Sequence, residues 1–206
     1  MHRSAWGVVV SCLILGSSAA HAEDAAPAQP AVDPALEAMM AAAKLAGSPG
    51  EGHKALEPFV GTWTYTMEWR LSPDAPPQQM SGKSVNTLVF DGRFLKQEVQ
   101  GDATPDFPAF GGLGFTGYDN IRKEYQSVWL DNMGTGLMMS TGQRDPATGT
   151  IAEQGDFSCP MTGEAHRKFR AVWKAVDPQH NIYESYSYAP DGREFKSMEI
   201  RYTRAQ

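Results

Sequence analysis

The stretch from Thr62 to Arg70 alternates strictly between apolar and polar side chains, and this pattern constrains the fold more than any other feature of the chain. Trp63, Tyr65, Met67 and Trp69 share one face, while threonines and charged residues occupy the other. Because successive side chains of a β-strand point to opposite faces, nine alternating residues predict a strand with one dry and one wet face. Threonines and aromatic residues favour the strand conformation further.

Similar segments follow one another to the C-terminus, most of them joined by short turns such as Asp91-Gly92 and Asp191-Gly192. Short connections make neighbouring strands antiparallel, because parallel strands need long crossovers. Closing such a sheet into a barrel also removes its open edges. We therefore predict one β-barrel domain over residues 58–206. Its strands are expected at 62–70, 81–90, 93–100, 112–118, 124–130, 135–143, 150–157, 165–176, 182–188 and 194–204.

A helical segment, 33–57, is predicted before the barrel. Asp33 is a good N-cap, Pro34 suits the first turn, and Gly47 suits the end of the first helix. A modest apolar stripe follows that helix, made of Leu36, Met39, Met40 and Ala43. The preceding residues, 23–32, are rich in Ala and Pro and have little to bury, so we expect a disordered leader there.

Residues 1–22 have the pattern of a cleavable signal peptide. A start that contains Arg3 is followed by a mostly apolar core from Trp6 to Leu15 and by the small-x-small site Ala20-His21-Ala22. The apolar core is shorter than the roughly 20 residues that span a bilayer. We expect export, to the periplasm or out of the cell. A lipoprotein-type cut before Cys12 is the alternative, but the apolar core continues past that residue.

The charge of the chain disfavours two classes of partner. There are 24 acidic against 18 basic residues, a net charge of −6, and the basic residues are scattered singly. Nucleic acids and anionic membrane surfaces both select clustered Lys and Arg. No later segment is apolar enough to span a bilayer, so we expect no stable membrane insertion after signal removal. Cleavage would leave Cys159 as the single cysteine, which excludes an internal disulfide and favours a buried, idle thiol.

Gly61-Thr62-Trp63 opens the first predicted strand, directly after a short helical turn. A Gly-x-Trp at this place resembles the lipocalin and fatty-acid-binding superfamily, the calycins. In that superfamily the tryptophan closes one end of the barrel, and an arginine from the last strand packs across it and hydrogen-bonds back to the chain start. Alternation in the last strand places Arg204, and not Arg201, on the apolar face. The resemblance implies a structural trio of Gly61, Trp63 and Arg204 with a cation–π contact.

The stretch from Phe59 to Arg204 also resembles the bacterial "domain of unknown function 1579" family. The matching segments are Val60-Gly61-Thr62-Trp63, Gly92-Arg93-Phe94-Leu95, Gly114-Phe115-Thr116-Gly117-Tyr118-Asp119-Asn120, Asp131-Asn132-Met133-Gly134-Thr135-Gly136, Asp156 to Gly163 and Glu194 to Ile200, with Pro49 to His53 as a lead-in. The resemblance implies an all-β fold: an antiparallel up-and-down lipocalin-like barrel of about ten strands with a short N-terminal helix. It implies no activity, because none is established for that family. Cys159 departs from the family pattern, which counts against thiol chemistry.

Barrels of this size hold one small ligand or are filled by side chains. Trp63 is expected in the packed core. The residues that we predict to contact a ligand are Tyr65, Trp69, Glu98, Tyr118, Trp129, Asn132 and Met138. Glu98 belongs to this set only if its strand has the less favoured register, in which it points inward and its pKa is raised by burial.

Two loops, Tyr118-Asp119-Asn120 and Asp131-Asn132-Met133-Gly134, are hypothesised to meet at the barrel mouth and offer oxygen ligands to calcium, although ordinary turn chemistry is favoured. The scattered methionines are interpreted as core filler and not as a soft-metal site. The histidines His53, His166 and His180 are expected at the surface. We predict no metal and no cofactor.

Three functions remain open at this point. The first is an exported protein that binds a small apolar molecule in its barrel. The second is a small enzyme that uses an inward carboxylate, such as Glu98, or a histidine. The third is an interaction module whose N-terminal helix, 33–46, docks a partner or plugs the mouth.

Overall fold

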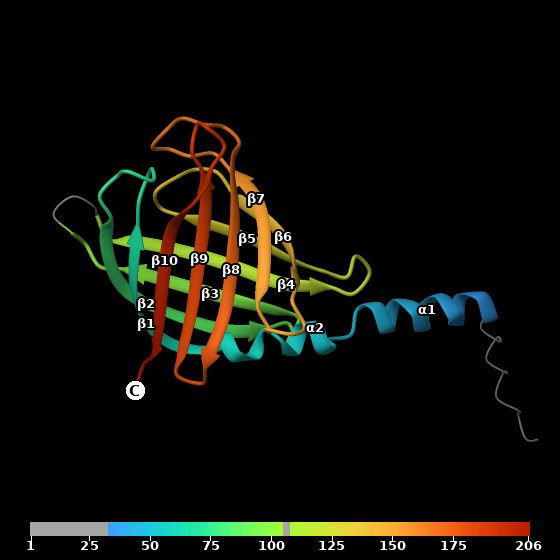
Figure 1. Ribbon diagram of the computed structural model, residues 1–206. Coiled ribbons are helices and arrows are strands. Elements are labelled where there is room, and N and C mark those ends of the chain that lie inside the picture. Colours follow the sequence, from blue (N-terminus) through green and yellow to red (C-terminus); the bar gives the residue numbers. More distant parts are fainter. Residues whose placement is uncertain (1–32, 105–107) are drawn as a thin grey trace, which may run out of the picture.

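A computed structural model describes residues 33–104 and 108–206, in which ten antiparallel strands close into one barrel (Figure 1). The predicted signal peptide and leader lie outside the described residues. Each strand pairs with its neighbours in sequence, and β1 pairs with β10. The strands are β1 (Gly61–Trp69), β2 (Gln78–Val89), β3 (Phe94–Gly101), β4 (Phe110–Asp119), β5 (Glu124–Asp131), β6 (Met138–Arg144), β7 (Ile151–Phe157), β8 (Arg167–Asp177), β9 (His180–Tyr188) and β10 (Glu194–Arg204). The predicted fold class is therefore confirmed.

Alternation decides which side chains face the interior. In β1, Trp63 and Tyr65 are buried while the threonines between them are exposed. In β3 the buried residues are Leu95, Gln97 and Val99, so the favoured register holds there. Because one-residue slips would turn every apolar side chain outward, the register of each strand is strongly specified.

One end of the barrel is closed by the short helix α2 (Glu51–Lys54) and the 3-10 turn η1 (Glu57–Phe59), which lie across it (Figure 1). Leu56 and Phe59 are buried there, in one cluster with side chains from β3, β5 and β7. His53 is also buried, so the prediction that it lies at the surface is wrong. Its Nδ1 accepts a hydrogen bond from the Gly50 N–H at 3.0 Å, and its ring packs edge-on against Tyr118.

The trio Gly61, Trp63 and Arg204 forms beneath this closed end. The Arg204 guanidinium lies 4.2 Å from the Trp63 ring, and the Trp63 indole N–H donates to Phe59 O at 3.0 Å. Arg204 Nε donates to Pro178 O, in the β8–β9 turn, which differs from the hydrogen bond to the chain start that the resemblance implies. Gly61 has a φ of 138°, and a Cβ there would lie 2.2 Å from an Arg204 nitrogen. Only glycine fits this position without strain.

The helix α1 (Pro34–Ala46) begins as predicted, with Asp33 accepting a hydrogen bond from the Ala35 N–H. It projects away from the closed end, and none of its residues is buried (Figure 1). The prediction that it plugs the mouth is therefore wrong, because the open mouth lies at the other end of the barrel; docking of a partner stays a prediction. Neither α1 nor α2 is long and apolar enough to cross a membrane.

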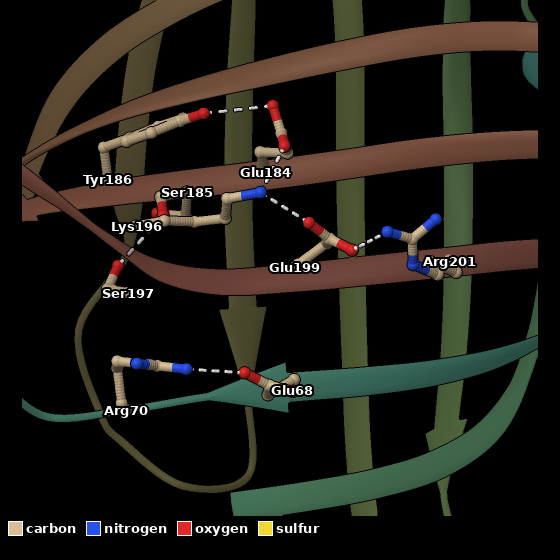
Figure 2. Close-up of polar contacts among 9 residues, drawn as sticks. All are labelled: Glu68, Arg70, Glu184, Ser185, Tyr186, Lys196, Ser197, Glu199 and Arg201. Atoms are coloured by element: carbon tan, nitrogen blue, oxygen red, sulfur yellow. Dashed lines mark hydrogen bonds and ion pairs between the residues drawn. The ribbon is translucent and has the colours of Figure 1, made fainter. Parts of the chain in front are cut away.

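Charged side chains cover the outside of β1, β9 and β10 (Figure 2). Glu68 and Glu199 lie opposite each other across the β1–β10 pair, where like charges destabilise a sheet. Arg70 pairs with Glu68 at 2.6 Å, and Lys196 bridges Glu184 and Glu199. These cations offset the repulsion at the seam that closes the barrel. Exposed pairs of this kind contribute about 0–1 kcal/mol each.

We expect replacement of Arg204 by alanine to lower the free energy of unfolding by about 1–3 kcal/mol, because it removes the cation–π contact and a hydrogen bond. Arg201→Ala is the matched control, since Arg201 lies on the outer face of the same strand and pairs with Glu199. It should change the free energy by less than about 0.5 kcal/mol. Urea titrations followed by circular dichroism measure both. Equal losses in the two variants would contradict the structural role of Arg204.

Candidate functional site

The half of the barrel away from α2 contains a cavity of about 410 Å³ that opens to solvent. Its walls come from all ten strands, and its mouth is bordered by the loops that follow β1, β3, β5 and β7. A space of this size is typical of pockets for small molecules. The walls of the cavity are lined by the apolar residues Tyr65, Met67, Trp69, Val99, Trp129, Met138, Trp173, Tyr183, Ile200 and Tyr202.

Trp129 is held flat against its wall by the glycines of β4. A Cβ on Gly112 or Gly114 would approach the Trp129 ring to 2.3 or 2.8 Å, so the indole occupies space that larger residues would fill. The Phe110 ring stacks on the Trp129 ring, with 6.3 Å between the ring centroids. The Trp129 indole N–H donates a hydrogen bond to Asp131 Oδ2 at 2.9 Å. These contacts fix an aromatic surface at the mouth of the cavity.

Polar side chains cross the cavity wall on four consecutive strands. We call Thr116, Ser127, Ser140 and Glu153 the polar belt. Thr116, Ser127 and Ser140 are direct cross-strand neighbours. The hydroxyls of Thr116 and Ser127 lie 2.8 Å apart, and Ser127 donates to Glu153 Oε1 at 2.5 Å. The belt therefore connects a chain of hydroxyls to one carboxyl group.

Glu153 is 3% exposed, although it is an ionisable residue that lines the cavity. Burial raises the pKa of its carboxyl group above the ordinary value, and hydrogen bonds from Ser127, Trp173 and Ser140 offset this only in part. Among the residues that the structure describes, no Lys, Arg or His makes an ion pair with it. Burial also raises the pKa of Tyr183, and the charge of Glu153 adds to that effect.

Small neighbours make room for this carboxyl group. Gly142 is paired with Glu153 across β6 and β7, and a Cβ there would lie 2.7 Å from Glu153 Cγ. On the other side Glu153 is paired with Ala171 of β8, which is buried. The sequence analysis missed Glu153. Alternation could have identified it, because Ile151 and Glu153 share one face of a strand and Ile151 is an obvious core residue.

Four of the predicted ligand-contacting residues line the cavity, namely Tyr65, Trp69, Trp129 and Met138. Their position agrees with the prediction, and their contact with a ligand stays a prediction. Trp69 and Trp129 lie towards the mouth, whereas Tyr65 lies deeper and packs against Tyr202 at 5.8 Å between ring centroids.

Three predicted residues do not line the cavity. Glu98 points outward from β3 and pairs with Lys96 at 2.7 Å, because its neighbours Gln97 and Val99 take the inner face. Tyr118 belongs to the closed end, where it packs against Tyr125 and His53 under α2.

Asn132 is the third predicted residue that does not line the cavity. Its amide holds the mouth loops together, since its Oδ1 accepts from the Gly111 N–H and its Nδ2 donates to Ala109 O. Asp119 ends β4 and Asp131 ends the antiparallel strand β5, so they lie at opposite ends of this strand pair. The two loops therefore do not meet, and the calcium hypothesis is wrong. The described residues contain no group of three His, Cys, Asp or Glu that could hold a metal ion. Asp119 instead accepts from two backbone N–H groups of its own turn.

Other candidate side chains are divided between the two faces of the barrel. His166 and His180 are exposed, as predicted, and Cys159 is buried in the loop after β7. Met138 and Met198 line the cavity, but Met133, Met139 and Met161 are exposed, so the interpretation of the methionines as core filler is wrong for these three.

Comparison with known proteins identifies the family. The family described as "Protein of unknown function (DUF1579)" matches residues 48–204. The chain belongs to this family. The matched range contains α2, η1 and the whole barrel, and it begins after α1. No curated protein matches the chain.

Two solved structures are similar to this DUF1579 protein. The "Crystal Structure of Rv2717c from M. tuberculosis" is 15% identical, covers 77% of this chain and 100% of its own, and gives a TM-score of 0.57, which shows a likeness of fold. A redesigned beta barrel, b11L5F_LGL, is 15% identical over 78% of this chain and 100% of its own, with a TM-score of 0.37.

We expect Glu153 to make folding stability depend on pH. Its pKa is raised in the folded state, so its contribution is fully present below the ordinary value of 4.5 and is lost as the pH rises through the raised pKa. Relative to Glu153→Gln, the wild-type protein should lose stability above pH 4.5, by at most about 1.4 kcal/mol per pH unit. Thermal unfolding of both proteins from pH 4 to 8 measures the difference. Glu98→Gln, which removes a carboxyl group from the outer face of β3, is the control and should not abolish the loss of stability above pH 4.5.

Proposed function

We propose that this DUF1579 protein binds a small, largely apolar molecule inside its barrel. The observation that carries the proposal is the open cavity of about 410 Å³, whose deeper walls are mostly aromatic and aliphatic. Removing such surfaces from water is favourable by roughly 25 cal/mol per Å² of apolar area, so an apolar guest gains affinity simply by entering.

The shape of the interior supports the same proposal. Bulky side chains fill the closed end, where Leu56, Phe59 and Tyr125 form a packed cluster. Towards the mouth, glycines and serines replace large residues on the inner faces of β4, β6 and β9. A barrel that served only as a stable scaffold would gain from filling that space, since cavities cost stability.

Glu98 and the histidines, which first suggested a small enzyme, do not line the cavity. Among the described residues that line the cavity there is no histidine, and Glu153 is the carboxyl group that lies deep inside. The partners of Glu153 are hydroxyl and indole groups, which suit recognition of a ligand better than removal of a proton from a nucleophile. We therefore favour binding over catalysis.

We expect Met138→Trp to weaken binding of the neutral fluorescent probe N-phenyl-1-naphthylamine by about ten-fold or more, because the added volume occupies the cavity. Met139→Trp is the matched control, since Met139 is the next residue of the same strand and is exposed on the outer face. It should leave the affinity unchanged within about two-fold. Fluorescence titration of the three proteins gives the affinities. Failure of the wild-type protein to bind the probe, or equal weakening by both substitutions, would contradict binding in the barrel.

We also propose that the chain is exported to the periplasm or out of the cell after removal of residues 1–22. The support is the sequence pattern of Arg3, the apolar core and the Ala20-His21-Ala22 site. The intact mass of protein recovered from the envelope or medium should correspond to residues 23–206. Ala22→Arg should keep the signal attached, because signal peptidase sites need a small residue there. A native protein that retains all 206 residues would contradict export by this route.

A further inference from the structure

Glu153 is a carboxyl group in an apolar cavity without an opposite charge. Such an arrangement is costly, since an isolated buried carboxylate loses its hydration without recovering it from an ion pair. The described basic residues that line the cavity, Arg70 and Arg167, lie at its mouth and pair with Glu68 and Glu164. A cation that neutralises Glu153 would therefore have to come from a ligand. In the empty cavity the carboxyl group therefore keeps its proton to a higher pH than usual, and a cation beside it would favour the ionised form.

The hydrogen bonds of Glu153 are incomplete as well. A carboxylate has about four lone-pair positions. Ser127 donates to one of them at 2.5 Å. Trp173 and Ser140 also stabilise the charged form of the carboxyl group. The carboxyl group can still accept from a donor that enters through the cavity. A ligand that completes this set must bring an N–H or O–H group, and a ligand that also balances the charge must bring it on a cation.

Aromatic rings surround the place where that cation would lie. Trp173 is paired with Tyr183 across β8 and β9, and their ring centroids are 4.6 Å apart. Tyr65, Trp129 and Tyr202 line the remaining walls. The faces of aromatic rings attract cations, most strongly where water is excluded. The same rings offer apolar surface to the rest of the ligand, so one cavity accommodates both halves of an amphipathic amine.

We propose that the ligand is a small lipophilic amine, whose ammonium group donates a hydrogen bond to Glu153 while its apolar body lies among the aromatic rings of the cavity. This inference rests on the proposed function, because it names the chemical class that the same cavity takes. A neutral alcohol could make the hydrogen bond but would leave the charge unbalanced. An acid of the same shape would bring a second negative charge to Glu153 and is excluded by repulsion.

Three probes with one apolar body separate these classes: 1-naphthylmethylamine, 1-naphthylmethanol and 1-naphthoate. Isothermal titration calorimetry at pH 7 should show that the wild-type protein binds the amine about ten-fold or more tightly than the alcohol, because charge-assisted hydrogen bonds are roughly twice as strong as neutral ones. The acid should bind more weakly than the alcohol.

Glu153→Gln keeps the shape of the side chain and removes its charge. It should reduce the preference for amine over alcohol to within about two-fold, with affinity for the alcohol retained. Glu98→Gln removes a carboxyl group from the outer face and should keep the full preference. The amine-to-alcohol ratio of the wild-type protein tests the proposal even without the variants.

The outcomes distinguish this inference from the function on which it rests. If the wild-type protein binds amine and alcohol equally, or if Glu153→Gln keeps the preference for the amine, the amine proposal is wrong while binding in the barrel stands. If none of the three compounds binds and N-phenyl-1-naphthylamine also fails to bind, both proposals fall together. A preference for the acid would overturn the amine proposal alone.

Discussion

Pairing of β1 with β10 closes the sheet, and the cavity exists only because of that closure. Seven consecutive pairs join the two strands, from Trp63 with Arg204 to Trp69 with Met198. At one end of this seam the Arg204 guanidinium covers the Trp63 ring and occupies the space beside Gly61. Farther along it, opposed glutamates are balanced by Arg70, Lys196 and Arg201 on the outer face (Figure 2). The first and last strands are thus joined from inside by a cation–π contact. On the outside, cations beside Glu68 and Glu199 reduce the repulsion between these two glutamates.

Closure alone would allow a barrel that is filled with side chains throughout. Here the filling is uneven, because the large residues of the segment before β1 enter only one end. Leu56 and Phe59 pack against Leu95, Tyr125 and Ile151 at the closed end. In the other half, aromatic side chains line the walls and leave the cavity between them. The barrel therefore has a stable base and a hollow upper half. The packed cluster and the cavity thus occupy different layers of the same strands.

Alternation predicted the strands, the inward face of β1 and the position of Arg204, because each of these depends on local period and parity. It could not place His53 or Tyr118, since their burial comes from α2 lying across the barrel end, and that contact joins distant parts of the chain. From the sequence alone, the polar side chain of Asn132 could contact a ligand or hold a loop in place. Its role was decided by the backbone of Gly111 and Ala109, which only tertiary structure brings near.

Glu153 shows a different limit of sequence reasoning. Its inward position follows from the same parity rule, but a charged residue on an inner face contradicts the expectation that such positions are apolar. Natural sequences break local rules of this kind mostly where function requires it. A glutamine at this position would keep the shape of the side chain without its charge. The small neighbours Gly142 and Ala171 leave space for a side chain of this length. Under the amine proposal, a cation beside Glu153 would offset the cost of burying its charge, which no described basic side chain does in the empty cavity.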